Sequence, residues 1–158
     1  ILDKKIDLGF AGKRIINKDI KSISLYKEKI ILAINKNNPL SKKKNISISD
    51  IKNENFILFP KSKGTVGLYD KIIEFCKKAN FEPNVIQEAY ELEVILGLVS
   101  GGMGIALIPE NSGKLYLKNI IFKKFKENSP ISEIYLLIRT NEEDSIVKNF
   151  FNLNKINV

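Results

Sequence analysis

The chain has 158 residues, 44% of them hydrophobic and 28% charged, so it is long enough for one domain or two small lobes with a buried core. It contains no histidine and one cysteine, which excludes Ser-His-Asp and Cys-His catalytic centres, histidine or thiolate metal sites, and an internal disulfide. Most carboxylates stand in the first turns of predicted helices or beside lysines, so we expect no enzymatic activity, no metal and no cofactor.

The formal net charge of +8 has two interpretations. It could mark a surface that binds nucleic acid, or it could follow from an isoleucine-, lysine- and asparagine-rich composition of the kind that AT-rich genomes encode. The lysines are scattered, and the clusters Lys42–Lys44 and Lys123–Lys124 are not interleaved with aromatic residues that could stack on bases. We favour the compositional interpretation and keep a basic binding surface as the alternative.

Several features of the sequence bear on its location. The most apolar run, Val94–Pro109, is shorter than the ~20 residues of a membrane-spanning helix and is interrupted by Ser100 and by glycines. The chain starts Ile-Leu-Asp-Lys-Lys without a secretory signal, and a single cysteine fits a reducing compartment. We therefore expect a cytoplasmic protein without a membrane partner.

The first part of the chain is predicted to contain three strands and one short helix, separated by turn residues. In order, these are a short buried strand Ile6–Phe10 followed by a turn at Ala11-Gly12, a strand Ser24–Asn35 ended by Asn38-Pro39, a short helix Ser47–Asn53 capped by Ser47 or Ser49, and a buried strand Phe56–Phe59 that stops at Pro60.

The second part alternates helices and strands. In order, these are a helix capped by Thr65 and running to about Ala79, a strand Asn84–Glu88, a helix Leu92–Ser100 that is apolar nearly all round, strands Ile105–Ile108, Ile120–Phe125 and Ile134–Arg139, and an amphipathic helix that begins at the T-x-x-E capping box Thr140–Glu143. On the first of these helices Cys76 shares the apolar face, so a core position is favoured over a reactive thiol.

This alternation predicts an α/β architecture with a mostly parallel sheet. In such sheets ligands bind at the carboxyl ends of strands, close to helix N-termini. Two segments satisfy this rule, namely Ala11–Arg14 after the first strand and Lys61–Thr65 after the strand that ends at Pro60.

The stretch Leu98–Glu110, LVSGGMGIALIPE, has three glycines in four residues and could hold a phosphate or end a helix. A phosphate-binding loop requires the order strand, glycines, helix, whereas here the order is helix, glycines, strand. We therefore interpret Gly101 or Gly102 as the left-handed residue that ends the helix, and Gly104 as permitting close approach of the next strand. The segment KSKGT, Lys61–Thr65, is the better anion candidate, although Gly64 could simply make a turn and Thr65 simply cap a helix.

The ordered segments resemble the effector-binding domain of LysR-type transcriptional regulators. The resemblance rests on IDLGF, on the run KIILAINKNNPLSKKKNISISDIKNENFILFP, on KSKGT before a helix, and above all on ILGLVSGGMGIALIPE. These segments span most of the chain.

The resemblance implies a type II periplasmic-binding-protein-like fold, in which two α/β lobes are joined by two crossover strands and a small ligand lies in the cleft. It places residues 1–22 and 116–158 in a first lobe, expected to be incomplete, and 23–115 in a second. The crossovers are expected near Ser24–Tyr26 and Ile120–Phe125.

The resemblance also implies a function and a site. The chain is expected to sense a small, anionic effector; family members form dimers or tetramers and bind DNA through an N-terminal winged helix-turn-helix that this chain lacks. The alternative is a transporter's solute-binding protein of the same fold. The ligand positions implied are Ala11, Gly12 and Lys13 in one loop, Ser62, Lys63, Gly64 and Thr65 in the other, and Met103, for which a core role is equally compatible.

Overall fold

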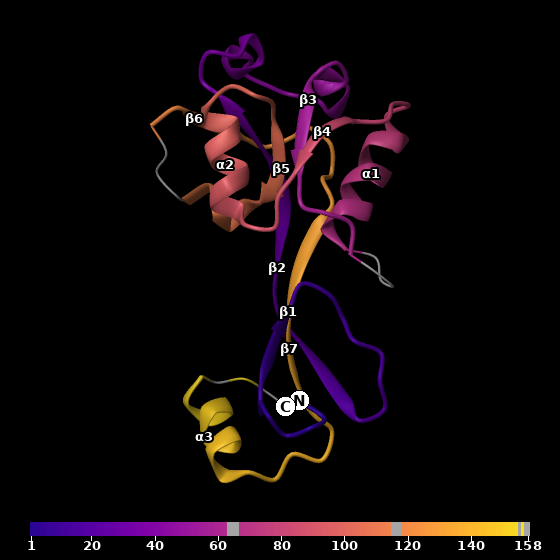
Figure 1. The fold of residues 1–158 in the computed structure, drawn as a ribbon, viewed down its shortest axis with the longest axis vertical. Coiled ribbons are helices and arrows are strands. Elements are labelled where there is room, and N and C mark those ends of the chain that lie inside the picture. The colour runs from indigo at the N-terminus through magenta and orange to yellow at the C-terminus, as the bar shows by residue number, and fades with distance from the viewer. Residues whose placement is uncertain (63–66, 115–117, 155, 157–158) are drawn as a thin grey trace. The chain divides into compact units, whose positions relative to one another are not determined.

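The structure is a computed structural model that describes residues 1–62, 67–114, 118–154 and 156. By its internal contacts the chain divides into two compact units, unit 1 (Ile1–Lys27 and Glu133–Val158) and unit 2 (Glu28–Ser132). The elements are β1 (Gly9–Ala11), β2 (Ile20–Asn35), β3 (Asn55–Leu58), α1 (Leu68–Lys78), β4 (Asn84–Glu88), α2 (Leu92–Ser100), β5 (Ala106–Pro109), β6 (Ile120–Lys123), β7 (Ile131–Arg139) and α3 (Ser145–Leu153), with short 3₁₀ helices at Pro39–Lys42, Ile48–Ile51 and Glu110–Lys114 (Figure 1).

Unit 2 contains a mixed sheet with the strand order β4-β3-β5-β2-β6. Strands β3 and β4 pair in parallel, while β2 pairs antiparallel with β5 and β6. A parallel bridge between Phe56 and Ile105 joins β3 to β5, and two backbone hydrogen bonds of 2.8 Å, from Ile57 N to Ile105 O and from Ile105 N to Asn55 O, support it. The prediction of a mostly parallel sheet is therefore wrong, because β2 runs antiparallel to both β5 and β6.

Helices cover both faces of this sheet, with α1 on one side and α2 on the other (Figure 1). Alternate residues of β2 explain the arrangement, since Ile30, Leu32 and Ile34 belong to the core cluster that contains α1 residues, whereas Ile31 and Ala33 belong to the cluster that contains α2 residues. A strand buried on both faces needs a continuous apolar run rather than an alternating one, which is the pattern of KIILAIN.

Cys76 lies fully buried on α1, as the sequence predicts, and burial raises the pKa of its thiol to about 12. Since the thiolate is the reactive form, the folded chain should hold Cys76 unreactive at neutral pH. We expect iodoacetamide to label Cys76 only as fast as unit 2 opens, and to label the urea-unfolded chain rapidly once the pH approaches about 8.5. Mass spectrometry measures both rates, and rapid labelling of the folded chain at neutral pH would contradict the burial.

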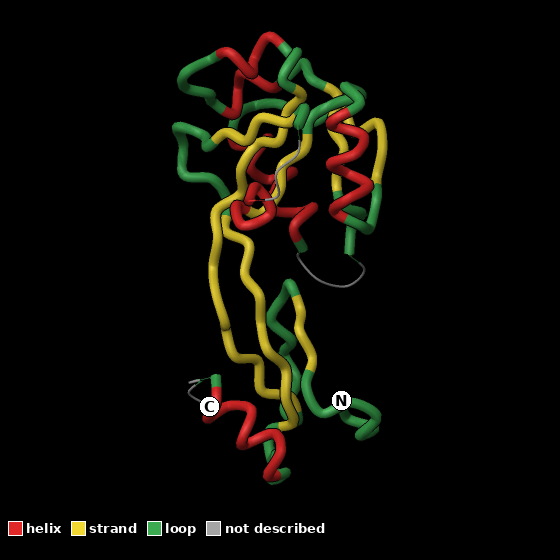
Figure 2. Tube along the Cα trace, turned by 90° about the vertical axis from the view of Figure 1, so that its left-hand side faces the viewer, coloured by secondary structure: helices red, strands yellow, loops and turns green. Residues whose placement is uncertain are grey.

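Unit 1 is built on β7, which lies between β1 and β2 in the sheet order. Strand β1 pairs antiparallel with β7 (Figure 2). Helix α3 contributes Val147 and Phe151 to a small core. The buried strand predicted at Ile6–Phe10 is wrong, because the strand begins only at Gly9 and the side chains of Ile6 and Phe10 are 53% and 67% exposed. The chain before Gly9 is held instead by a side chain of β7.

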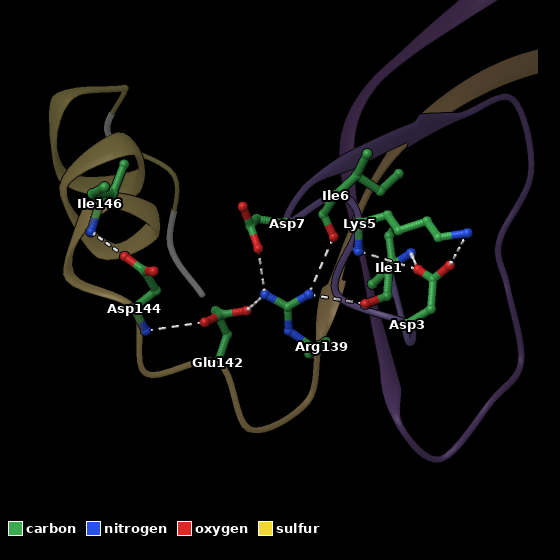
Figure 3. Close-up of polar contacts among 9 residues, drawn as sticks. All are labelled: Ile1, Asp3, Lys5, Ile6, Asp7, Arg139, Glu142, Asp144 and Ile146. Carbon is green, nitrogen blue, oxygen red and sulfur yellow. Dashed lines mark hydrogen bonds and ion pairs between the residues drawn. The ribbon is translucent and has the colours of Figure 1, made fainter.

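That side chain is Arg139, the last residue of β7 (Figure 3). Its Nη1 donates hydrogen bonds to the carbonyl oxygens of Ile1 (2.9 Å) and Ile6 (3.1 Å), and its Nη2 donates to Asp7 Oδ1 (2.6 Å) and forms an ion pair with Glu142. The hydrogen bond to Asp7 is the main cause that raises the pKa of Arg139 above its usual range. One guanidinium therefore fixes both the start of the chain and the turn that leads to α3.

Two predicted helix starts are wrong. Helix α3 begins at Ser145 with Asp144 as its N-cap, because the hydroxyl of Thr140 donates to Lys18 O (2.8 Å) instead of capping a helix. Helix α1 begins at Leu68 with Gly67 rather than Thr65 as its N-cap. Elsewhere the prediction holds, since Ser47 is the N-cap of the 3₁₀ helix Ile48–Ile51.

The strands that pass between the units are β2 and β7, which contribute residues to both. The crossover expected at Ile120–Phe125 is wrong, because β6 pairs with Leu32–Asn35 of β2 entirely within unit 2. Among the described residues, none of the helices is both long enough and apolar enough to span a lipid bilayer.

Candidate functional site

The carboxyl edge of unit 2 is where the parallel strands β3, β4 and β5 end together. Strand β3 leads into Phe59–Ser62 and β4 into Ala89–Glu91, and the two exits are tied by a hydrogen bond from Ala89 N to Leu58 O (3.1 Å). Helix α1 follows the first exit and α2 the second. Two helix N-termini therefore lie at one edge of the sheet, which is the arrangement that binds ligands in α/β folds.

The N-terminus of α1 is organised by its own polar groups. Gly67 N donates to Asp70 Oδ2 (2.9 Å), and the Lys61 amine lies 3.9 Å from the other oxygen of that carboxylate. A Cβ on Gly67 would lie only 3.0 Å from Ser62 Oγ, so the exposed serine hydroxyl packs directly against the start of the helix. Ser62 thus lies after the carboxyl end of β3, as the sequence predicts. Lys63, Gly64 and Thr65 lie outside the described residues.

The N-terminus of α2 is more open. Its N-cap is Glu91, whose side chain makes no capping hydrogen bond, and the first helical hydrogen bond runs from Ile95 N to Glu91 O. The N–H groups of the first turn therefore point out of the helix without helical acceptors. Tyr90, which precedes the helix, is 82% exposed at the same edge. Sequence reasoning did not select this segment, although the direct step from a strand to an apolar helix was a usable signal.

The loop predicted in unit 1 follows β1. Ala11 is the last residue of β1 and pairs with Tyr135 of β7. Gly12 is exposed with open space around its α-carbon, and Lys13 is half-buried and engaged in an interaction of its own. These three residues are contiguous and at a strand end, as the sequence predicts.

Met103 lies at the other end of β3 from Ser62. It lines a polar pocket of about 300 Å³ beside Asn55, the first residue of β3, and its side chain is 49% exposed. Asn35 forms another part of the wall, where its Nδ2 donates to Ser100 O (2.7 Å) at the end of α2. The structure therefore does not bring Met103 together with Ser62.

The glycine-rich stretch ends α2 and starts β5. Gly101 is the C-cap with φ −73°, and Gly102 follows with φ +79°, a left-handed conformation that favours glycine. A Cβ on Gly104 would lie 2.5 Å from Asn55 O, so β5 can approach β3 only if this residue has no side chain. These observations confirm the structural roles predicted for Gly102 and Gly104. The described residues also contain no group of three or more metal-ligating side chains.

Comparison with known proteins identifies the fold. The family described as "LysR substrate binding domain" matches residues 1–154. The chain belongs to this LysR family. The resemblance seen in the sequence is thereby confirmed, as is the type II periplasmic-binding-protein-like fold that it implies.

Individual LysR proteins agree with this assignment. AlsR of Bacillus subtilis, an HTH-type transcriptional regulator, is 28% identical over 153 residues, or 97% of this chain and 50% of AlsR. The dual regulator GltC of the same bacterium is 40% identical over 113 residues, or 71% of this chain and 37% of GltC. The effector-binding domain of BenM from Acinetobacter baylyi, solved with its effector benzoate, has a TM-score of 0.75 and 25% identity over 99% of this chain and 74% of that structure.

The chain therefore spans about half the length, or less, of these curated relatives. All of them are regulators of transcription, so the family assignment is to the effector-binding part of LysR-type regulators. A solute-binding protein of a transporter is not favoured.

Proposed function

We propose that this LysR domain binds a small anionic metabolite at the carboxyl edge of unit 2, and that binding controls transcription through a DNA-binding domain elsewhere in a longer protein. The observation that carries the proposal is that α1 and α2 both start at the carboxyl edge of this sheet, with the exposed hydroxyl of Ser62 beside the start of α1. Helix N-termini favour anions through their free N–H groups and dipoles. The BenM domain, which shares this fold, was solved with benzoate, a carboxylate.

The proposed contacts are those expected from the sequence. In unit 2 they are Ser62, Lys63, Gly64 and Thr65, while the loop expected in unit 1, with Ala11, Gly12 and Lys13, stays a prediction of its own. Met103 stays a separate prediction, since it lies at the other end of β3. The lobe boundaries at 1–22 with 116–158 and at 23–115 likewise stay predictions.

The longer protein is proposed to be a cytoplasmic dimer or tetramer that acts on DNA and not as an enzyme. Its relatives are HTH-type regulators, which supports DNA as the eventual partner. An effector shifts such a protein between states only if it binds one state more tightly than the other. Ligand affinity measured in the presence and absence of operator DNA would therefore report the coupling.

The proposal predicts selective binding of carboxylates. In a thermal-shift and calorimetric screen of small carboxylates that starts with benzoate, each paired with its uncharged amide, at least one acid should bind saturably and its amide should not. Ser62→Ala should lower the affinity for that acid by about tenfold, which corresponds to the loss of one hydrogen bond to a charged group. Ser49→Ala, at an exposed serine of the 3₁₀ helix Ile48–Ile51, is the matched control and should leave the affinity unchanged.

The outcomes separate the parts of the proposal. Binding of the amides instead of the acids would refute the anionic effector. Equal loss in both serine variants would remove Ser62 from the site. A weaker affinity in Met103→Leu but not in Ser62→Ala would move the site to the pocket beside Asn55.

A further inference from the structure

The two lysine clusters of the sequence lie side by side in unit 2. A parallel bridge pairs Ile46 with Phe125, and Lys126 N donates to Ile46 O (2.9 Å). The Lys123 amine donates to Lys43 O (2.5 Å), which links the last residue of β6 to the lysine-rich loop before the 3₁₀ helix Ile48–Ile51. Lysines that are scattered in the sequence are therefore gathered by backbone pairing into one place.

These segments enclose a concave pocket of about 430 Å³, which we call the lysine pocket. Its volume lies within the range of about 300–1,000 Å³ typical of sites for small molecules. Ile46, Phe122 and Phe125 give it an apolar part, and the other residues are polar or charged. The lining residues are Lys44, Asn45, Ile46, Phe122, Lys123, Lys124, Phe125 and Lys126.

Carboxylates neutralise this region only in part. Asp50 forms an ion pair with Lys43 (2.6 Å), whose hydrogen bond is the main cause that holds the pKa of Asp50 below its usual range. Glu110 forms an ion pair with Lys124. A third carboxylate, that of Glu127 just after the pocket, accepts a hydrogen bond from a backbone N–H.

Three of the lysines that line the pocket have no carboxylate partner among the described residues, although the Lys123 amine donates to Lys43 O. Within the described part of the chain, no carboxylate lies within ion-pair distance of Lys44, Lys123 or Lys126. The side chains of Lys44 and Lys126 are exposed and that of Lys123 is half-buried. Like charges around one cavity repel one another, and a multivalent anion bound there would reduce that repulsion.

We propose that the lysine pocket binds a small anion that carries several phosphate groups. Ammonium groups act as point charges for phosphate oxygens, and several of them around one cavity suit a multiply charged ligand better than a single carboxylate. A cavity of this size holds a small molecule, whereas a duplex backbone needs an extended surface. The pocket lies on the β6 side of the sheet, whereas Ser62 follows β3 on the other side of β5 and β2, so this inference does not depend on the effector site.

The test uses sodium tripolyphosphate as the probe, titrated calorimetrically into the chain with sodium chloride adjusted to constant ionic strength. We expect saturable binding of one ion per chain. Lys44→Gln/Lys126→Gln should weaken it by at least about tenfold, because two charge-assisted contacts are lost. Lys77→Gln/Lys78→Gln removes two exposed lysines from the last turn of α1, outside the pocket, and should change the affinity by less than about twofold.

The melting temperature measured without tripolyphosphate tests whether misfolding causes the weaker binding of the double variant. Lys44→Gln/Lys126→Gln should melt no lower than the parent chain, because repulsion is reduced. Equal weakening in both double variants, or binding that does not saturate, would show a net-charge effect and overturn the proposal. A short DNA duplex that binds more tightly than tripolyphosphate at equal phosphate concentration would also overturn it, in favour of an extended nucleic-acid surface.

Discussion

Gly104→Ala is expected to lower the free energy of unfolding of unit 2 by about 3 kcal/mol, at the upper end of overpacking costs. The new methyl group would lie 2.5 Å from Asn55 O, and a backbone atom cannot rotate away as a flexible side chain can. The same carbonyl oxygen accepts the hydrogen bond from Ile105 N (2.8 Å) that joins β3 to β5. Relief of the clash therefore requires separation of two strands at the centre of the sheet.

Urea denaturation followed by circular dichroism measures this effect. Gly97→Ala is the matched control, because Gly97 is an exposed residue inside α2 with no atom within 4 Å of the added Cβ. That substitution should instead stabilise the chain by about 0.5–1 kcal/mol through helix propensity. If Gly104→Ala were as stable as the parent, close approach would not explain the glycine.

The glycine-rich stretch shows what the order of elements in the sequence can establish. The order helix, glycines, strand is enough to identify a helix stop, and Gly102 with φ +79° confirms it. The bounds Asn84–Glu88 and Leu92–Ser100 are likewise predicted correctly, since Pro83 and Gly101 mark the neighbouring boundaries. Strong local signals of this kind need no knowledge of the rest of the chain.

Boundaries set by distant residues could not be predicted in this way. The segment before Gly9 does not continue as a strand because Arg139 binds its carbonyl oxygens from the far end of the sequence. The start of α1 has a local cause instead, because Gly67 N pairs with Asp70 at the i, i+3 spacing of a helix start, which the sequence analysis did not select. Only the contacts of Arg139 have no fixed sequence spacing, so no local pattern predicts them.

In the candidate site, too, some residues can be placed from the order of elements and others cannot. The rule that ligands bind at strand carboxyl ends selects Ser62 correctly as an edge residue, because it needs only the order of elements. Met103 could not be placed by that rule, since its position at the amino end of β3 depends on how β5 lies against β3. The lysine pocket depends on the pairing of Ile46 with Phe125, which no local sequence pattern predicts.

Phe56→Ala is expected to have the largest effect of all, a loss of about 3–5 kcal/mol in the free energy of unfolding. Phe56 is fully buried in β3, where its ring lies 6.4 Å from that of Phe81, centroid to centroid. Truncation leaves a cavity beneath the strand that leads to Ser62. Phe56→Leu fills most of that cavity and should cost no more than about 1.5 kcal/mol.

Phe10→Ala is the matched control, because Phe10 is 67% exposed in β1 and its loss should change stability by less than about 0.5 kcal/mol. An effector that binds only the folded chain adds RT ln(1 + [L]/Kd) to its stability, so a saturating ligand at about 100 times Kd should restore about 2.7 kcal/mol to Phe56→Ala. Such rescue would show that the variant still folds to a state that binds the effector, so that Phe56 contributes to stability rather than to ligand contact. If the effector fails to stabilise Phe56→Ala at a concentration that saturates the parent chain, the truncation has disrupted the site itself.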